Sequence, residues 1–328
     1  IIACSELVKI GEARHGIHDE LAYTSDAVTV EGYTYRPIGT AAKWEYIVFV
    51  EGEDDTAERL ADILSISLST IKNLYDKNSF IKNIILDNIL PSDIYIKGKE
   101  LRFNTEEVRV VFLIKFLSRT EVLPFNMVQQ IFPDKNKDYV ISISEQDIVV
   151  VKEIKGGTDI REIEKLARSI ADTLGTEFYA KVAIGIGTAV DNIKDLARSY
   201  KEAQTAIEVG KVFDTEKTVI SYENLGIGRL IYQLPTTLCE MFLQEVFKYG
   251  SLESLDHETL MTIQCFFENN LNVSETSRKL FVHRNTLVYR LEKIRKLTGL
   301  DLREFDNAIT LKVALMVKRY LTTKPVKF

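Results

Sequence analysis

The most regular pattern of apolar positions lies near the C-terminus, where it follows the period of an α-helix. Four aliphatic residues recur at steps of four, three and three: Leu287, Leu291, Ile294 and Leu297. This spacing puts them on one helical face, and the polar residues between them fall elsewhere on the surface. Gly299 follows the last periodic position and predicts the end of the helix.

A shorter helix is predicted immediately upstream, in the segment NVSETSRKLF at 272–281. Asn272 or Ser274 can cap this helix. Thr276 and Leu280 are its candidate inward positions. A short helix, a turn of three or four residues and a longer basic helix are typical of a helix-turn-helix, whereas a solvated amphipathic pair is the simpler alternative.

The middle of the chain, residues 94–223, alternates strand and helix patterns. Four runs are predicted as strands: RVVFLIKF (109–116), YVISIS (139–144), DIVVVKEI (147–154) and KVAIGIGT (181–188). Two amphipathic runs are predicted as helices: 158–175 and 191–211. This alternation predicts an open sheet covered by helices. The GIG at 185–187 lacks the third glycine of a dinucleotide-binding fingerprint, which favours core or turn glycines.

Two further patterns precede this block. Residues 1–52 contain strand-like runs at 27–38 and 44–52, and one helix is predicted near 11–21. Apolar residues then recur at helical steps: Leu60, Leu64, Leu68, Ile71 and Tyr75, followed by Ile81, Ile85 and Ile89. They predict a long helix or, with an interruption near 76–79, a helix pair, ending at Pro91. The stripe either packs into a core or pairs with a second copy as a dimerising signalling helix.

Composition narrows the class of protein. A chain of 328 residues with 45% hydrophobic and 27% charged residues can form two or three ordinary soluble domains. No apolar run approaches the roughly 18–20 residues that cross a bilayer. No signal peptide is visible in a chain that starts at Ile1. We therefore expect a cytoplasmic protein without a membrane partner. Cys4, Cys239 and Cys265 are far apart and lack ligand spacing, which favours reduced thiols and predicts no metal and no cofactor.

Positive charge is concentrated at the C-terminal end of an acidic chain. Residues 272–328 hold thirteen Lys and Arg against five Asp and Glu, a balance of +8. The whole chain carries −6, so the first 271 residues carry −14. A basic module suits phosphate contact, because affinity increases with each counterion released. Together with the Arg-Asn-Thr start of the second helix, this charge favours DNA over a merely solvated helix pair.

The segment NVSETSRKLFVHRNTLVYRLEKIRKLTGLDL (272–302) resembles the C-terminal helix-turn-helix of PucR/CdaR-type regulators, bacterial transcription factors for purine and sugar-diacid catabolism. The shared core is HRNTLVYRLEKIRKLTG, followed by a terminal helix at 305–320. In this family the second helix enters the major groove. The resemblance implies these DNA contacts: Arg284, Asn285, Thr286, Tyr289 and Arg290, with Lys293 further along on phosphate. It also implies that His283 caps the helix and that Leu287 and Leu291 are core.

The middle block resembles GGDEF domains, the diguanylate cyclase fold. Residues 181–207 are similar to the closing strand and helix, and YVISISEQDIVVV (139–151) matches the hairpin that carries the motif. A cyclase needs glycines in this turn and carboxylates that hold divalent metal. The turn instead contains Ser144, Glu145, Gln146, Asp147 and Ile148, and the first strand, 108–116, has no acid. These departures predict a degenerate, non-catalytic domain.

The N-terminal IIACSELVKIGEARHGIHDELA (1–22) resembles the diacid-recognition region of CdaR-type regulators, in which a strand ending in IIAS leads to IG and a helix with His. Ala-Cys-Ser replaces the usual Ala-Ser here, and the preceding strand is missing. The resemblance implies a truncated PAS-like sensor whose backbone amides near Ile10 and Gly11 receive a carboxylate at a helix start. His15 and Arg36 are the candidate side chains nearby. Alternatively, His15 and His18 lie on an exposed helical face.

These patterns predict an α+β multidomain protein. Its predicted parts are a partial PAS-like sensor (1–55), a linking signalling helix (56–92), a degenerate GGDEF-like α/β domain (93–232) and an all-α helix-turn-helix DNA-binding domain (236–328). The predicted function is a ligand-responsive transcriptional regulator of carbohydrate-diacid or related catabolism. We expect no enzyme activity, and as partners double-stranded DNA, a small carboxylate effector such as a sugar diacid or glycerate, and a second copy in a homodimer. Two alternatives stay open: a nucleotide cyclase-like enzyme on 93–232, and a scaffold whose basic helix binds an acidic protein.

Overall fold

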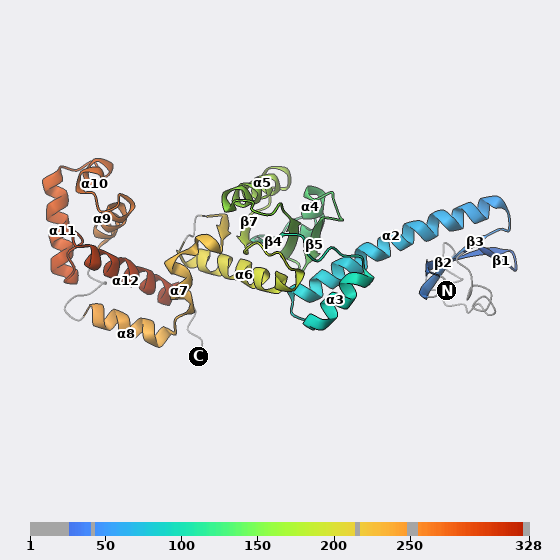
Figure 1. Cartoon of the computed structure of the whole chain (residues 1–328). Helices are drawn as coiled ribbons and strands as arrows, with labels where there is room; N and C mark the ends of the chain where they lie inside the picture. The colour runs from blue at the N-terminus through green and yellow to red at the C-terminus, as the bar shows by residue number, and fades with distance from the viewer. Residues whose placement is uncertain (1–25, 41–42, 214–216, 248–254, 324–328) are drawn as a thin grey trace.

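A computed structural model describes residues 26–40, 43–213, 217–247 and 255–323. Figure 1 shows a small N-terminal sheet, one long helix, a central sheet covered by helices, and a helical C-terminal group in an elongated arrangement. This architecture confirms the predicted α+β multidomain class. Five predicted features lie outside the described residues: the helix near 11–21, Cys4, and the candidate ligand residues Ile10, Gly11 and His15.

An antiparallel sheet begins the described chain, in the order β1 (Val28–Val30), β2 (Tyr33–Thr40) and β3 (Lys43–Glu51). These strands confirm the runs predicted at 27–38 and 44–52. Glu31 and Gly32 both have positive φ, 50° and 81°, as a two-residue hairpin turn requires. The sheet packs on the first half of α2 (Asp55–Ile85), where Ala57 and Ala61 are buried and the Ser65 hydroxyl donates to the carbonyl of Pro37 at 2.8 Å.

α2 is one unbroken helix of 31 residues, so the predicted interruption near 76–79 is wrong. Asp76, Asn78 and Ser79 are weak helix formers. The turns that follow are nevertheless held by tertiary packing, because Phe80, Ile81, Ile84 and Ile85 are buried against the central sheet. The predicted end at Pro91 is wrong as well. Pro91 begins α3 (Pro91–Glu100), because the first helical position needs no N–H donor.

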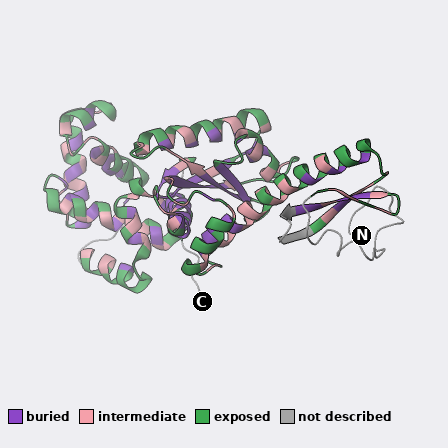
Figure 2. Ribbon diagram, turned by 45° about the vertical axis from the view of Figure 1, so that its right-hand side comes forward, coloured by how far each residue is buried: buried purple, intermediate pink, exposed green. Residues whose placement is uncertain are grey.

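The central sheet has the strand order β5-β6-β4-β7-β8. Its strands are β4 (Arg109–Phe116), β5 (Asp138–Ser142), β6 (Asp147–Glu153), β7 (Val182–Ile186) and β8 (Val219–Ser221). One face of the sheet packs on α2, α3 and α6 (Leu196–Phe213). The other face packs on α4 (Pro124–Ile131) and α5 (Ile160–Phe178). A short 3-10 turn (Ile193–Asp195) precedes α6. Figure 2 shows these strands as a buried layer between helices with exposed outer sides. The predicted helix-covered open sheet is confirmed.

α6 approaches the sheet closely at Gly185 of β7 and at Gly187, which follows that strand directly. A Cβ built on Gly185 would lie 2.1 Å from the carbonyl oxygen of Ala203. A Cβ on Gly187 would lie 2.0 Å from the carbonyl oxygen of Ser199. Only glycine fits at these contacts, which confirms the prediction of core glycines and excludes the dinucleotide reading of this sequence.

Helices form the remainder of the described chain. In order they are the 3-10 turn Glu223–Leu225, α7 (Ile227–Gln233), α8 (Thr236–Val246), α9 (His257–Glu268), α10 (Val273–Lys279), α11 (Arg284–Thr298) and α12 (Phe305–Thr323). α12 confirms the predicted terminal helix and packs on α8, α7 and the end of α6, where Tyr320 is fully buried. Across the described ranges, no helix has the length and apolar character that crossing a membrane requires.

Candidate nucleic-acid interface

α10 and the turn after it have the predicted geometry. The Asn272 side chain caps α10 by accepting from the backbone N–H groups of Ser274 at 2.9 Å and Glu275 at 3.1 Å. Thr276 is buried, and Leu280 packs partly buried against the core of this domain. The backbone N–H of Phe281 donates to the carbonyl of Arg278 at 3.1 Å and closes the turn. The shorter helix and its connection are therefore confirmed.

α11 is held rigidly at both ends and along one face. His283 is its N-cap, and Nδ1 of that side chain accepts from the backbone N–H of Asn285 at 3.2 Å, which confirms the predicted capping role. Gly299 closes the C-terminal end at a φ of 79°. Leu287, Leu291 and Ile294 are fully buried, and Leu297 is partly buried. The predicted core face is thus confirmed.

The opposite side of α11 presents four candidate DNA contacts to solvent. Arg284, Asn285 and Thr286 are exposed in the first turn, and Tyr289 follows one turn later with 71% of its surface exposed. The N-terminal end of a helix carries partial positive charge, which favours approach to phosphate. In Figure 1, α11 lies at the far end of the molecule from the N-terminal sheet, at the outer edge of the helical group.

Arg290 and Lys293, also predicted as DNA contacts, bind α9 in this structure. The Arg290 guanidinium pairs with Glu258 and donates to the Thr262 hydroxyl at 3.3 Å. Lys293 Nζ donates to Asp256 Oδ2 at 2.9 Å. Sequence patterns could not reveal these pairs, because the partners are 28 to 37 residues apart.

Asp256 is both the N-cap of α9 and the partner of Lys293. Its Oδ1 accepts from the backbone N–H of Thr259 at 2.8 Å, while Oδ2 accepts from Lys293. Hydrogen bonds from Thr259 and then Lys293 hold the pKa of Asp256 far below its usual value. The capping bond and the ion pair with Lys293 therefore use different oxygens of the same carboxylate.

A second charge cluster closes the other end of α11. Asp301 Oδ1 accepts from both the backbone N–H of Arg303 at 3.0 Å and its Nε at 2.8 Å. Arg303 also pairs with Glu292, which lies on α11 itself. Hydrogen bonding by Arg303 lowers the pKa of Asp301 from 3.8 to about 2. The loop between α11 and α12 is thereby fixed to α11.

We expect this cluster to make the C-terminal domain acid-sensitive. A carboxyl group whose pKa is lower in the folded chain stabilises it above the unfolded value near 3.8, and this contribution is lost as pH falls towards about 2. The thermal midpoints of wild type and Asp301→Asn should therefore differ at pH 6 and converge between pH 4 and 2. A difference that stays constant over this range would contradict the assignment.

Asp147, one of the two acids in the hairpin turn of the central domain, contacts neighbouring side chains of the same domain. Asp147 is paired in register with Lys115 of β4, and Lys115 Nζ lies 3.6 Å from Asp147 Oδ1. The Ser144 hydroxyl lies 3.1 Å from Asp147 Oδ2. A lysine therefore stands beside the Asp147 carboxylate, where a metal-binding site would need a further acid. Within the described ranges, no three His, Cys, Asp or Glu residues group as they would around a metal.

At the N-terminal sheet, the candidate ligand residue Arg36 connects β2 with α2. Its Nε lies 3.1 Å from Asp62 Oδ1, and both side chains are partly exposed. Of the four candidate ligand residues, Arg36 lies within the described part of the chain, whereas Ile10, Gly11 and His15 lie outside it.

Comparisons with known proteins agree with this arrangement. Residues 259–317 match the family described as the PucR C-terminal helix-turn-helix domain, and residues 87–209 match the family described as the GGDEF-like domain. The carbohydrate diacid regulator of Escherichia coli (strain K12) is 30% identical over 190 residues, which cover 56% of this chain and 49% of that protein.

Two regulators of Bacillus subtilis (strain 168) are also similar. The purine catabolism regulatory protein is 26% identical over 150 residues, covering 45% of this chain and 28% of that protein. The proline-responsive transcriptional activator PutR is 25% identical over 191 residues, covering 55% of this chain and 46% of that protein. The matched segments thus span less than half of each of these three relatives. With a match to the GGDEF-like domain followed by a match to the PucR C-terminal helix-turn-helix domain, the chain is similar to the PucR/CdaR-type regulators.

Proposed function

We propose that this protein is a transcriptional regulator that binds a specific double-stranded DNA sequence through α11 and responds to a small carboxylate effector. One observation carries the proposal. The first turns of α11 expose Arg284, Asn285, Thr286 and Tyr289, while Leu287, Leu291 and Ile294 on the aliphatic face of the same helix are fully buried. A helix that is fixed on one side and polar at its free N-terminal end is suited to the major groove.

The chemistry of the exposed residues fits base recognition. An arginine fork can bind guanine O6 and N7, and an asparagine amide can bind adenine N6 and N7. Arg290 and Lys293 lie deeper, on the side that faces α9, where they pair with acids of that helix. We assign them phosphate contact, made by exchanging these acids for the DNA backbone.

A binding assay against selected DNA tests the proposal. Duplexes enriched from a random pool should bind roughly 10³-fold or more tightly than unrelated duplexes at the same salt concentration. Heparin serves as the control, because a scaffold that binds any acidic partner would bind heparin and all duplexes alike. Failure to enrich any duplex sequence would overturn the proposal.

The effector proposal rests on Arg36. The names of two similar proteins refer to carbohydrate diacids and to proline, so the effector of this chain is proposed only as a class, a small carboxylate such as a sugar diacid or glycerate. Such a ligand would compete with Asp62 for the Arg36 guanidinium and would change how α2 is held to the sheet. A thermal-shift screen with hydroxy-dicarboxylates, glycerate and purine breakdown products tests this, with Arg36→Met as the matched control.

We further propose that the central domain has no cyclase activity. Lys115 occupies the side of Asp147 on which a metal would need a second carboxylate, and the hairpin lacks the glycines that admit a nucleotide. Purified protein should therefore form no cyclic dinucleotide from GTP with magnesium or manganese. Steady product formation that disappears in Asp147→Ala would refute this prediction.

A further inference from the structure

The first half of α2 exposes a continuous row of large apolar side chains. The apolar stripe consists of Leu60, Ile63, Leu64, Leu68, Ile71 and Tyr75, whose exposed fractions range from 41% to 72%. Helices at a protein surface ordinarily expose charged and polar residues. Monomeric proteins rarely expose contiguous apolar patches larger than a few hundred Å². The stripe is therefore a candidate contact surface.

Charge is excluded from this stripe. Between positions 60 and 75, α2 has two charged residues, Asp62 and Lys72, and both contact the N-terminal sheet. Asp62 pairs with Arg36, and Lys72 Nζ lies 5.7 Å from the ring centroid of Tyr46. The side of α2 that packs on the sheet carries the small residues Ala57, Ala61 and Ser65, so the stripe is a different face of the helix.

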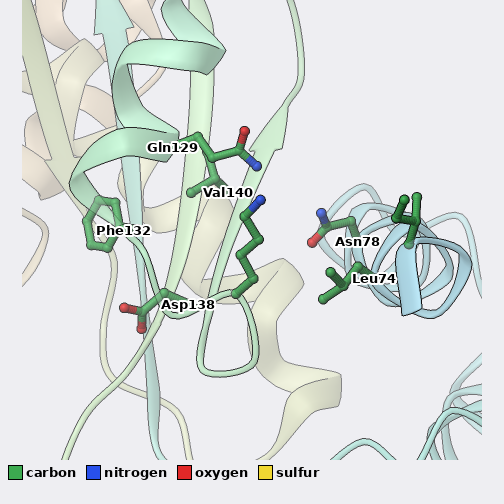
Figure 3. A pocket seen from close by; sticks show the side chains of 8 residues that line it. Leu74, Asn78, Gln129, Phe132, Asp138 and Val140 are labelled. Atoms are coloured by element: carbon green, nitrogen blue, oxygen red, sulfur yellow. The ribbon is translucent and has the colours of Figure 1, made fainter. Parts of the chain in front are cut away.

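The central domain does not cover the C-terminal end of the stripe, near Ile71. Ile71 and Leu74 line a cavity of about 190 Å³ between α2 and the central domain. Figure 3 shows Leu74 and Asn78 on one side of this cavity and Gln129 and Val140 on the other. α2 and the central domain are therefore separated by this cavity near Ile71, whose side chain stays 61% exposed.

We propose that the occupant of the stripe is the stripe of a second copy, with the two α2 helices parallel. The same surface on both copies is self-complementary under two-fold symmetry, so apolar residues meet apolar residues and no charge is buried. Half-exposed aliphatic side chains contribute roughly 50–70 Å² each, on the order of 400 Å² per copy for the stripe. With Ser67, Thr70 and Leu74 between them, the pair reaches about 1,000 Å², which a specific interface requires.

The parallel direction rests on the proposed DNA-binding function. Specific helix-turn-helix proteins bind as dimers to two half-sites about one helical turn apart. Parallel α2 helices send both C-terminal domains in the same direction, whereas antiparallel helices of 31 residues, about 46 Å long, would send them to opposite ends. Only the parallel pair brings two copies of α11 to one duplex.

Charge substitutions test the interface. Wild type should have the molar mass of a dimer by light scattering, and Leu64→Glu with Leu68→Glu should give a folded monomer. The matched control is Ile66→Glu with Asn73→Glu, which adds the same charge to the same helix on exposed positions outside the stripe and should remain dimeric. A monomeric wild type, or a dimeric stripe variant, would overturn the proposal.

Disulfide crosslinking tests the direction and does not depend on how the charge variants fold. In parallel helices, Ser67→Cys and Leu60→Cys should each crosslink to the same residue of the second copy under mild oxidation, whereas Asn73→Cys should not. Crosslinking at Ser67→Cys alone would indicate antiparallel helices and contradict the parallel arrangement. Wild type provides the background of the three native cysteines.

DNA binding separates this inference from the function on which it rests. The stripe variant should lose at least tenfold in affinity for a duplex with two half-sites and bind a single half-site as wild type does. If wild type forms the crosslinks but enriches no DNA sequence, the DNA-binding proposal fails while the paired stripe stands. If it binds selected DNA but forms no crosslink, the stripe proposal fails alone.

Discussion

Replacing Arg284 by Ala is expected to weaken binding to the selected DNA site by about 1–3 kcal/mol, on the order of 10- to 100-fold, and to relax base preference at one position. Arg284 is exposed at the first position of α11, and its loss should not disturb the cap, which His283 makes with Asn285. Asn285→Ala should act in the same way at a neighbouring base, since its side chain is exposed and its backbone N–H, which the cap uses, is kept.

The control is Lys296→Ala, at an exposed position near the other end of α11. A lysine that contacts phosphate contributes equally to all sequences, so this variant should weaken every duplex alike and reduce the salt slope by about one. Affinity and sequence preference should be measured together at two or more salt concentrations. If the Arg284→Ala protein kept its affinity and its sequence preference, another surface would make the sequence-specific contacts with DNA.

Gly187→Ala is expected to unfold or severely loosen the central domain. Its new Cβ would lie 2.0 Å from the carbonyl oxygen and 2.4 Å from the hydroxyl of Ser199, so α6 would have to move away from β7. Since α6 belongs to the core on one face of the sheet, this displacement should cost several kcal/mol of unfolding free energy, at the upper end of single substitutions.

Gly175→Ala provides the matched comparison. This glycine lies within α5, and the nearest atom to an added Cβ is 4.0 Å away. Alanine there should stabilise the domain by about 0.5–1 kcal/mol, because it reduces the freedom of the unfolded chain and favours helix. If α6 touches β7 as described, denaturant unfolding should show that Gly187→Ala lowers the free energy of unfolding and that Gly175→Ala raises it. Equal effects would contradict that contact.

Patterns with a short range in sequence predicted the C-terminal domain well. The steps of Leu287, Leu291 and Ile294 and the stop at Gly299 depend on helix geometry alone, so they were correct without tertiary knowledge. The roles of Arg290 and Lys293 depend on acids of α9 far along the chain. A basic residue on a helix carries no signal that separates such an ion pair from a phosphate contact.

The length of α2 shows a different limit. Weak helix formers near 76–79 suggested a break, but the buried residues 80–85 keep the helix continuous by packing on the central sheet. Periodicity identified the apolar stripe and left open whether it belongs to a core. The arrangement of the sheet on another face of α2 shows that the stripe lies outside the core that the described residues form.

The burial of Tyr320 has a practical consequence for anyone who isolates the DNA-binding domain. Its ring packs in a cluster that includes Val212 of α6, and its hydroxyl donates to the carbonyl of Tyr232 at 3.0 Å. A fragment that starts near 236 would leave Val317 and Tyr320 without these neighbours and expose an apolar surface. Such a fragment is prone to aggregate in concentrated solution, whereas one that keeps the whole central domain keeps this surface covered.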